Sequence, residues 1–174
     1  MRPFNAAAPF GMKELLLTRG MTALVDEEDF ESLSSYKWNA QPRRCDLWYA
    51  ARNRNAVERK LLGGRGIIYL HRQIMNALKG TEIDHRNGNG LDCRRANMRF
   101  ATSRQNKANG RPKRSKRTST FKGVYWGTRE RRWLVQIRLP DGRRLGKGFN
   151  SENEAASYYT EIARKIHGEF ARST

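Results

Sequence analysis

The stretch over residues 81–109 reads TEIDHRNGNGLDCRRANMRFATSRQNKAN and decides the fold of the chain around it. Residues 81–85 have the composition of a short strand, and residues 98–101 can form a returning strand after a turn-rich excursion through Asn-Gly pairs. Thr102 or Ser103 can then cap a helix that carries Asn106. The sequence therefore predicts two strands followed directly by a helix.

Three side chains in this stretch indicate hydrolytic chemistry. Asp84 and Asn106 offer hard oxygen ligands for Mg²⁺ or Mn²⁺, and His85 can take a proton from water near neutral pH. Because adjacent strand residues point to opposite faces, Asp84 and His85 can share a site only where the strand ends or bulges. Taken singly, each residue is better explained by an ordinary turn or helix cap, whereas the whole set at this spacing favours a metal-dependent hydrolase.

The order His85, Asn97, Asn106 follows the pattern H-x11-N-x8-N, and over residues 67–109 the chain resembles the HNH nuclease family in its His-Asn-Asn form. The resemblance implies that His85 is the general base and that Asp84 and Asn106 hold a single divalent cation. It also implies that Asn97 ties the two strands together and orients His85. Such sites fold as a ββα-metal unit, here over residues 81–109.

Length and charge indicate two small units that bind a polyanion. The chain has 174 residues and a net charge of +18. Residues 1–50 hold 6 basic and 7 acidic residues (net −1), residues 51–110 hold 13 and 4 (net +9), and residues 111–174 hold 16 and 6 (net +10). The excess charge thus lies on the expected nuclease and on the residues after it, and double-stranded DNA is the expected partner.

Several classes of protein are disfavoured. No long apolar run or basic amphipathic helix indicates a membrane partner. Cys45 and Cys93 form neither a disulfide framework nor a zinc site, which favours a reducing cytoplasmic setting, in a bacterial host cell if the gene belongs to a phage. We expect a monomer without a small-molecule cofactor.

The expected fold class is α+β, in four parts. Residues 1–11 form a disordered extension, and residues 12–110 form the nuclease domain with an N-terminal β-rich platform. This platform has strands at 15–18, 22–25 and 47–51, a helix capped by Asp26, and a Gln41-Pro42 turn. Residues 111–118 form a basic linker, and residues 119–174 form a DNA-binding domain. The linker residues expected to contact DNA are Lys113, Arg114, Lys116 and Arg117.

The last part reads as a three-stranded antiparallel sheet with a helix. Strands are expected at 121–126, 132–139 and 143–149, and a Ser151–Glu154 capping box begins a helix that Gly168 ends. In the middle strand, apolar residues alternate with polar ones, so the helix covers one face and the other can enter a major groove. The residues expected to contact DNA are Lys122, Tyr125, Trp126, Arg132, Gln136, Arg138, Arg143, Arg144 and Lys147.

This part resembles the Apetala/ethylene-response-factor DNA-binding domain over residues 119–172, through FKGVYW, RRWLVQIRL and EAASYYTEIARKIHGEFA. Its third strand carries one residue more than the family's usual Leu-Gly-x-Phe end, at Leu145-Gly146-Lys147-Gly148-Phe149. This departure leaves the contacts of Arg143, Arg144 and Lys147 open.

Together, these features indicate a sequence-directed DNA endonuclease that resembles the homing endonucleases of phages and mobile introns. Arg72 or Arg99 is expected to clamp the scissile phosphate, and His71 either packs within a helix over residues 69–78 or touches a phosphate. One metal site per chain makes nicking of a single strand the simpler expectation. Two alternatives remain open: a non-catalytic DNA-binding regulator, and an RNA-binding protein, although the latter lacks paired stacking aromatics.

Overall fold

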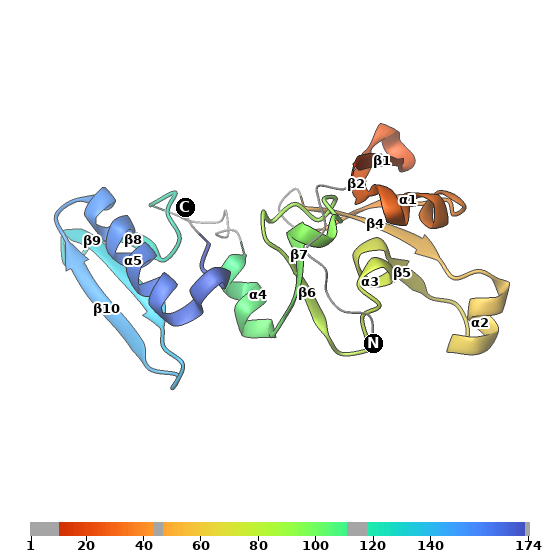
Figure 1. Cartoon of the computed structure of the whole chain (residues 1–174). Helices are drawn as coiled ribbons and strands as arrows, with labels where there is room; N and C mark the ends of the chain where they lie inside the picture. The colour runs from red at the N-terminus through yellow and green to blue at the C-terminus, as the bar shows by residue number, and fades with distance from the viewer. Residues whose placement is uncertain (1–10, 44–46, 111–117, 173–174) are drawn as a thin grey trace. The chain divides into compact units, whose positions relative to one another are not determined.

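The protein has two compact units in a computed structural model that describes residues 11–43, 47–110 and 118–172. The first unit extends to Phe100 and the second begins at Ala101 (Figure 1). The sequence predicts this boundary at residues 111–118, ten residues later. The helix α4 (Ser103–Asn109) contacts α5 and η3 of the second unit, which explains the difference. Residues 1–10 of the predicted extension and 111–117 of the predicted linker lie outside the described residues.

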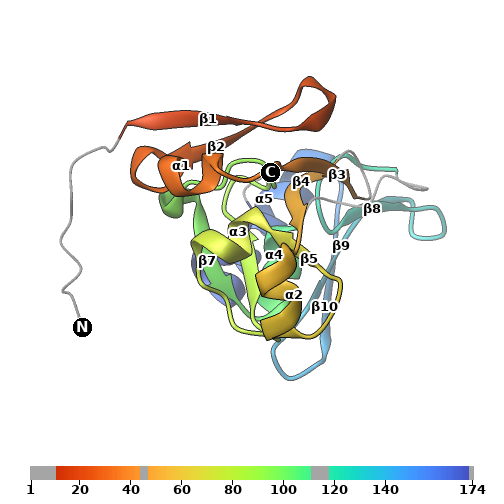
Figure 2. The same ribbon diagram turned by 90° about the vertical axis from the view of Figure 1, so that its right-hand side faces the viewer.

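The first unit begins with an antiparallel pair of strands and a helix beside it (Figure 2). Strand β1 (Met12–Leu16) pairs with β2 (Thr22–Asp26) across the short helix η1 (Thr18–Gly20), and α1 (Glu27–Ser34) follows. Asp26 precedes α1 as predicted, but its side chain does not cap the helix. Its Oδ2 instead accepts a hydrogen bond from the Arg95 amide at 2.7 Å, so a residue distant in sequence takes the capping oxygen.

A three-stranded antiparallel sheet follows, in the order β3-β4-β5. Its strands are β3 (Asn39–Pro42), β4 (Trp48–Asn53) and β5 (Ile67–Tyr69), with α2 (Ala56–Leu62) between the last two. The predicted Gln41-Pro42 turn is wrong, because both residues pair with β4. Proline is tolerated there because β3 is an edge strand. Helix α3 (Leu70–Ile74) is shorter than the predicted 69–78.

The core of the first unit lies between this sheet, α1 and α3. Trp38 and Leu70 are among its most buried side chains, and the Trp38 indole donates a hydrogen bond to the Leu33 carbonyl at 2.9 Å. Burying an indole with its N–H satisfied avoids the cost of an unpaired polar group. The core thereby fixes β4 and α3, the two elements that border the candidate site.

The decisive stretch forms the predicted order of elements. Strand β6 (Glu82–His85) and strand β7 (Met98–Ala101) make a two-stranded sheet, with η2 (Arg95–Asn97) before β7, and α4 follows. The excursion between β6 and β7 is anchored on β2, since the Leu24 amide donates to the Leu91 carbonyl and the Cys93 amide to the Leu24 carbonyl, both at 2.8 Å. At Gly90, a Cβ would lie 2.4 Å from the Trp48 carbonyl oxygen, so only glycine fits against β4.

The second unit contains α4 and an antiparallel sheet in the order β10-β9-β8. Its strands are β8 (Val124–Gly127), β9 (Arg132–Arg138) and β10 (Arg144–Phe149), and they are followed by α5 (Glu152–His167) and η3 (Gly168–Phe170). Helix α5 packs on one sheet face through Ala155, Tyr159 and Ala163, as predicted (Figure 1). Thr102 and Gln105 form a capping box on α4, whereas Ser151 makes no side-chain cap on α5, so that predicted box is wrong.

Candidate active site and nucleic-acid interface

Asp84 is buried at the end of β6 and is held by an arginine from β7. Its side chain is 4% exposed, and its Oδ2 accepts a hydrogen bond from Arg99 Nε at 2.8 Å and forms an ion pair with Arg99 Nη2 at 2.7 Å. Arg99 is itself only 8% exposed. A buried ion pair of this geometry compensates the desolvation of both charges. The arrangement therefore favours a role for Arg99 in positioning Asp84 over the expected contact with a phosphate.

His85 is the last residue of β6 and lies among aromatic rings. Its ring centroid is 5.2 Å from that of His71 and 5.8 Å from that of Tyr49, and the Tyr69 ring stacks on His71 at 5.6 Å. Burial lowers the pKa of His85 to about 4, although the Asp84 and Asp92 carboxylates act in the opposite direction. Both imidazoles are neutral near pH 7, because burial also lowers the pKa of His71 to about 3. A neutral imidazole is the form that can accept a proton from water.

The strand ends at His85, which is where the sequence requires a break if Asp84 and His85 are to share a site. The Gly88 amide donates to the His85 carbonyl at 2.8 Å, and Gly88 has φ of 68°, a left-handed conformation that glycine adopts without strain. The Arg86 amide donates to the Asn97 carbonyl at 2.8 Å. The chain thus turns immediately after the proposed base.

Asn97 connects the start of β7 to the excursion that follows β6. Its Oδ1 accepts a hydrogen bond from the Asn87 backbone N–H at 3.1 Å, and its Nδ2 donates to the Asp92 backbone carbonyl at 2.8 Å. The Asp92 side chain is 2% exposed and accepts from Arg94 Nε at 2.8 Å and Nη2 at 2.7 Å. These bonds fix the loop between β6 and β7, which begins at the residue after His85.

The oxygen ligands expected for a metal lie on both units. The Asp84 carboxylate belongs to β6. Asn106 lies on α4, where its backbone N–H donates a hydrogen bond to the Thr102 carbonyl at 2.9 Å. Within the described ranges, no group of three or more His, Cys, Asp or Glu residues is placed to hold a metal ion. A carboxylate and a carboxamide oxygen fit a hard cation such as Mg²⁺ or Mn²⁺ better than zinc.

Arg72 holds a loop together. Its guanidinium donates to the carbonyls of Thr81 and Leu78 at 2.7 Å each and to that of Ala77 at 3.3 Å. These bonds close the segment between α3 and β6. The geometry therefore favours a structural role over the expected phosphate clamp.

The open face of the second sheet gathers five of the residues expected to contact DNA. Residues paired across antiparallel strands share a face. The register pairs Tyr125 with Leu134, Gly146 with Gln136, and Arg144 with Arg138, on the side opposite to Val135 and the other residues that α5 covers. This open face presents Tyr125, Arg132, Gln136, Arg138 and Arg144.

Four other expected contacts lie elsewhere in this unit. Lys147 pairs with Val135 on the side of α5, and its ammonium is 4.7 Å from the Tyr158 ring centroid. Trp126 pairs with Trp133 on that same side, and their ring centroids are 5.3 Å apart. Arg143 lies in the turn and bonds to Asp141 at 2.7 Å. Lys122 donates to carbonyls at the end of α4, and the expected contacts Lys113, Arg114, Lys116 and Arg117 lie outside the described residues.

Some neighbours of the site were not identified as such from the sequence. The Tyr49 ring, on β4, lies beside the His85 ring, and burial raises the pKa of the Tyr49 hydroxyl. Asp92, which is buried, pairs with Arg94, whose side chain is 39% exposed, beside Asn97. The Leu70-His71-Arg72 triplet is the local sequence signal that places His71 near the site. No pattern in the sequence predicts the contact of Tyr49 with His85, because only the folded chain brings the two residues together.

Comparison with known proteins agrees with this geometry. Residues 69–108 match the sequence model of the HNH endonuclease family, so this segment is an HNH endonuclease domain, which supports DNA endonuclease activity. Over 94 residues the chain is 31% identical to Protein 3.8 of Escherichia phage T7, and the alignment covers 54% of this chain and 76% of that protein. The chain belongs to the same family as Protein 3.8. No solved structure gives a significant match. None of the described helices is long and apolar enough to cross a membrane.

Proposed function

We propose that the protein is a metal-dependent, sequence-directed DNA endonuclease that hydrolyses phosphodiester bonds. One observation carries this proposal: a buried, neutral imidazole, His85, directly follows a buried carboxylate, Asp84, inside the segment that matches the HNH endonucleases. This pair combines a proton acceptor with a hard metal ligand, as cleavage of a phosphodiester requires.

In the proposed mechanism, neutral His85 accepts the proton of the water that attacks phosphorus. Asn97 fixes the loop after β6 and so orients His85, and Arg99 holds the Asp84 carboxylate in place. Asp84 and Asn106 would hold one Mg²⁺ or Mn²⁺ ion, which when bound stabilises the leaving 3′ oxygen and the developing charge. Asn106 would complete this site as part of a ββα-metal unit.

Recognition of duplex DNA is proposed for the second unit. The open face with Tyr125, Arg132, Gln136, Arg138 and Arg144 has the guanidinium and carboxamide groups that read base edges in a major groove. An antiparallel three-stranded sheet with one helix supports the proposed relation to the Apetala/ethylene-response-factor domain. The linker residues would contact phosphates on either side.

We further propose that the protein is a monomeric homing endonuclease of a phage or mobile element that nicks DNA in the cytoplasm of its host cell. The similarity to a protein of a phage supports this setting. A net charge of +18 on 174 residues supports tight, salt-dependent association with a polyanion.

A nicking assay tests the proposed function. Supercoiled plasmid that also carries the DNA flanking the protein's own gene is incubated with the full chain in Mg²⁺, in Mn²⁺, or in EDTA. We expect conversion to the nicked form with either metal and none in EDTA. Tight binding of the plasmid without nicking in either metal would instead identify a non-catalytic DNA-binding regulator.

A further inference from the structure

A second polar surface lies on the β3-β4-β5 sheet of the first unit. The register pairs Asn39 with Ala51, Gln41 with Tyr49, and Asn53 with Ile67. The alternate residues of these strands face the core, where Ala40 and Ala50 are buried. The carboxamides of Asn39, Gln41 and Asn53 therefore share the face that points away from the core.

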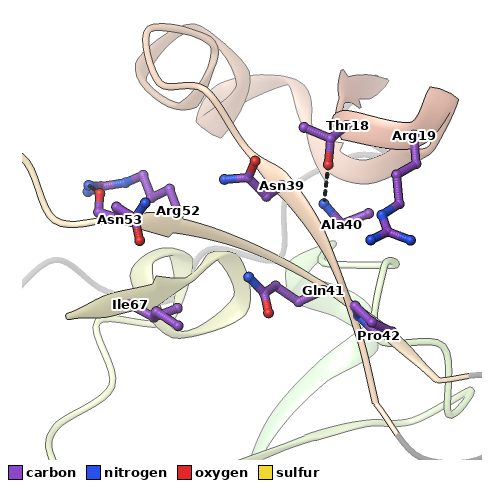
Figure 3. Close-up of a pocket in the computed structure, with 9 residues that line it drawn as sticks. All are labelled: Thr18, Arg19, Asn39, Ala40, Gln41, Pro42, Arg52, Asn53 and Ile67. Atoms are coloured by element: carbon purple, nitrogen blue, oxygen red, sulfur yellow. Dashed lines mark hydrogen bonds between the residues drawn. The ribbon is translucent and has the colours of Figure 1, made fainter.

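A cavity of about 390 Å³ opens beside η1 at the edge strand β3, and residues of this face line part of it. Figure 3 shows the carboxamides of Asn39 and Gln41 extending to the same side of β3, and the Arg19 guanidinium extending from η1 toward β3. The cavity is lined by Thr18, Arg19, Asn39, Ala40, Gln41, Pro42, Arg52, Asn53 and Ile67. It draws on η1 and all three strands of the sheet.

The polar groups of this cavity divide into two classes. Thr18 and Arg52 serve the fold, since Thr18 Oγ1 accepts from the Ala40 amide at 3.1 Å and Arg52 pairs with Glu58 at 2.6 Å. By contrast, the side chains of Asn39, Gln41, Asn53 and Arg19 make no hydrogen bond or ion pair with any described residue. Each carboxamide offers two donors and one acceptor oxygen, so these groups are available to a ligand.

The charge of the cavity suits nucleic acid. No carboxylate is among the described residues that line it, although residues 1–50 as a whole are slightly acidic, with 6 basic and 7 acidic residues. Arg19 reaches the cavity from the other side of the edge strand β3, since its guanidinium lies 5.6 Å from the ring centroid of Trp48, which pairs with Pro42. A guanidinium suits a phosphate, and carboxamides suit the hydrogen-bonding edges of bases.

The same face leads to the proposed active site. Gln41 pairs with Tyr49, so the two side chains share the face, and the Tyr49 ring is 5.8 Å from the His85 ring. Arg43, two residues after Gln41, donates to the Tyr69 hydroxyl at the same end of the sheet. Gln41 and the ring beside His85 therefore lie on the same side of the sheet.

We propose that the open face of the β3-β4-β5 sheet, together with the adjoining cavity at the β3 edge, binds duplex DNA beside the scissile phosphate. Arg19 contacts a phosphate, and Asn39, Gln41 and Asn53 hydrogen-bond to base edges and so contribute to the choice of cleavage site. The inference rests on the proposed endonuclease function. It assigns DNA recognition to the first unit in addition to the second.

The carboxamides are tested with the full-length triple variant N39A/Q41A/N53A, and Asn153→Ala on α5 is the control because Asn153 is also an exposed carboxamide. Cleavage sites on plasmid are mapped by sequencing of the new ends. We expect the ratio of cutting at preferred sites to cutting at other sites to be at least about tenfold lower for the triple variant than for the wild type, since a single bidentate base contact can discriminate by that factor. If the triple variant does not fold, Gln41→Glu replaces it, because glutamate has nearly the same size and shape as glutamine. We expect Gln41→Glu to weaken DNA binding, because its carboxylate repels the phosphates.

The phosphate contact is tested with Arg19→Gln and with Arg19→Lys as its charge-preserving control. Affinity for a labelled duplex is measured by anisotropy over a range of salt concentrations. We expect the slope of log affinity against log salt to fall by about 1 for Arg19→Gln and to stay unchanged for Arg19→Lys.

Unchanged site preference and unchanged salt dependence in these variants would overturn the inference, as would an equal effect of Asn153→Ala. The result is distinguishable from failure of the proposed function. If the wild type does not nick DNA, the endonuclease assignment fails, while the anisotropy measurement with Arg19→Gln and Gln41→Glu still decides whether this face binds DNA.

Discussion

At the scale of single residues, the ion pair of Asp84 and Arg99 is the contact on which the site depends most. Both side chains are buried, and Arg99 donates a hydrogen bond to one carboxylate oxygen and forms an ion pair with it. Removal of the arginine would take away the cation that lies on this buried carboxylate.

We predict that Arg99→Ala lowers the free energy of unfolding by about 3–5 kcal/mol and reduces cleavage, because breaking a buried pair costs far more than breaking an exposed one. Arg143→Ala is the control, since Arg143 is 79% exposed and pairs with Asp141 at 2.7 Å. Its loss should cost less than about 1 kcal/mol. Urea denaturation of both variants measures the difference, and equal effects would contradict the role assigned to Arg99.

His71 links the stability of the first unit to pH. Burial lowers its folded pKa to about 3 from an ordinary value of 6.5, so the unfolded chain binds more protons between these values. The free energy of unfolding therefore falls as the pH drops below about 6.5. From pH 7 to about pH 5, His71 should account for a loss on the order of 2 kcal/mol.

We predict that His71→Asn reduces the loss of stability between pH 7 and about pH 5, as measured by urea denaturation at both values. The control His167→Asn should reduce it less, because His167 at the end of α5 is less buried, although burial lowers its pKa too. An identical pH dependence in the wild type and His71→Asn would show that His71 is not buried in its neutral form.

At the scale of elements, α4 is held by residues from other parts of the second unit. Lys122 Nζ donates to the carbonyls of Lys107 and Gly110 at 2.9 Å each and to that of Ala108, and Arg172 donates to the Asn109 carbonyl at 3.3 Å. These cations lie at the end of the helix where the carbonyls lack partners within the helix and the dipole is negative. The helix that carries Asn106 is thus stabilised by residues beyond the HNH segment.

We predict that Lys122→Met frays the last turn of α4 and weakens cleavage at low Mn²⁺ more than at saturating Mn²⁺, because Asn106 is a proposed ligand. Hydrogen exchange at the Gly110 amide, which donates to the Asn106 carbonyl at 3.0 Å, should accelerate about fivefold or more. Lys165→Met on α5 is the control, since its pair with Glu161 is exposed. Unchanged exchange at Gly110 would refute the stabilising contact.

Because of the contact between Lys122 and the end of α4, deletion of residues 119–174 would disturb α4 as well as DNA recognition.

The elements that the sequence predicts well are those with strong local signals. Strand β7 and the cap at Thr102 follow from turn residues and from a Thr–Gln capping box, and α5 follows from its apolar stripe and Gly168. Strand β3 was missed because Gln41-Pro42 resembles a turn, and only its position at a sheet edge makes proline acceptable. Likewise, Asp26 has the residue type of a cap, but Arg95 takes its carboxylate through a contact that is distant in sequence.

At the scale of the whole molecule, the HNH spacing predicts Asp84, His85 and Asn97 as site residues, because they lie in one continuous segment. The surroundings of His85 could not be predicted in the same way. Tyr49 and His71 reach it only after β4 and α3 have packed, and Arg99 turned inward to Asp84 although the charge pattern favours a DNA contact. Contacts between distant segments decide which arginines face DNA, and residue type alone does not.

In the proposed mechanism, cleavage depends on His85 as the acceptor of the proton from the attacking water. The most direct measurement compares His85→Ala with the wild type in single-turnover nicking of plasmid in Mg²⁺, together with binding of the same DNA, with His167→Ala as the control histidine. We predict that His85→Ala loses cleavage by at least about a hundredfold, as expected for removal of a general base, while binding the DNA with nearly the same affinity. Nicking by His85→Ala at the wild-type rate would contradict this account.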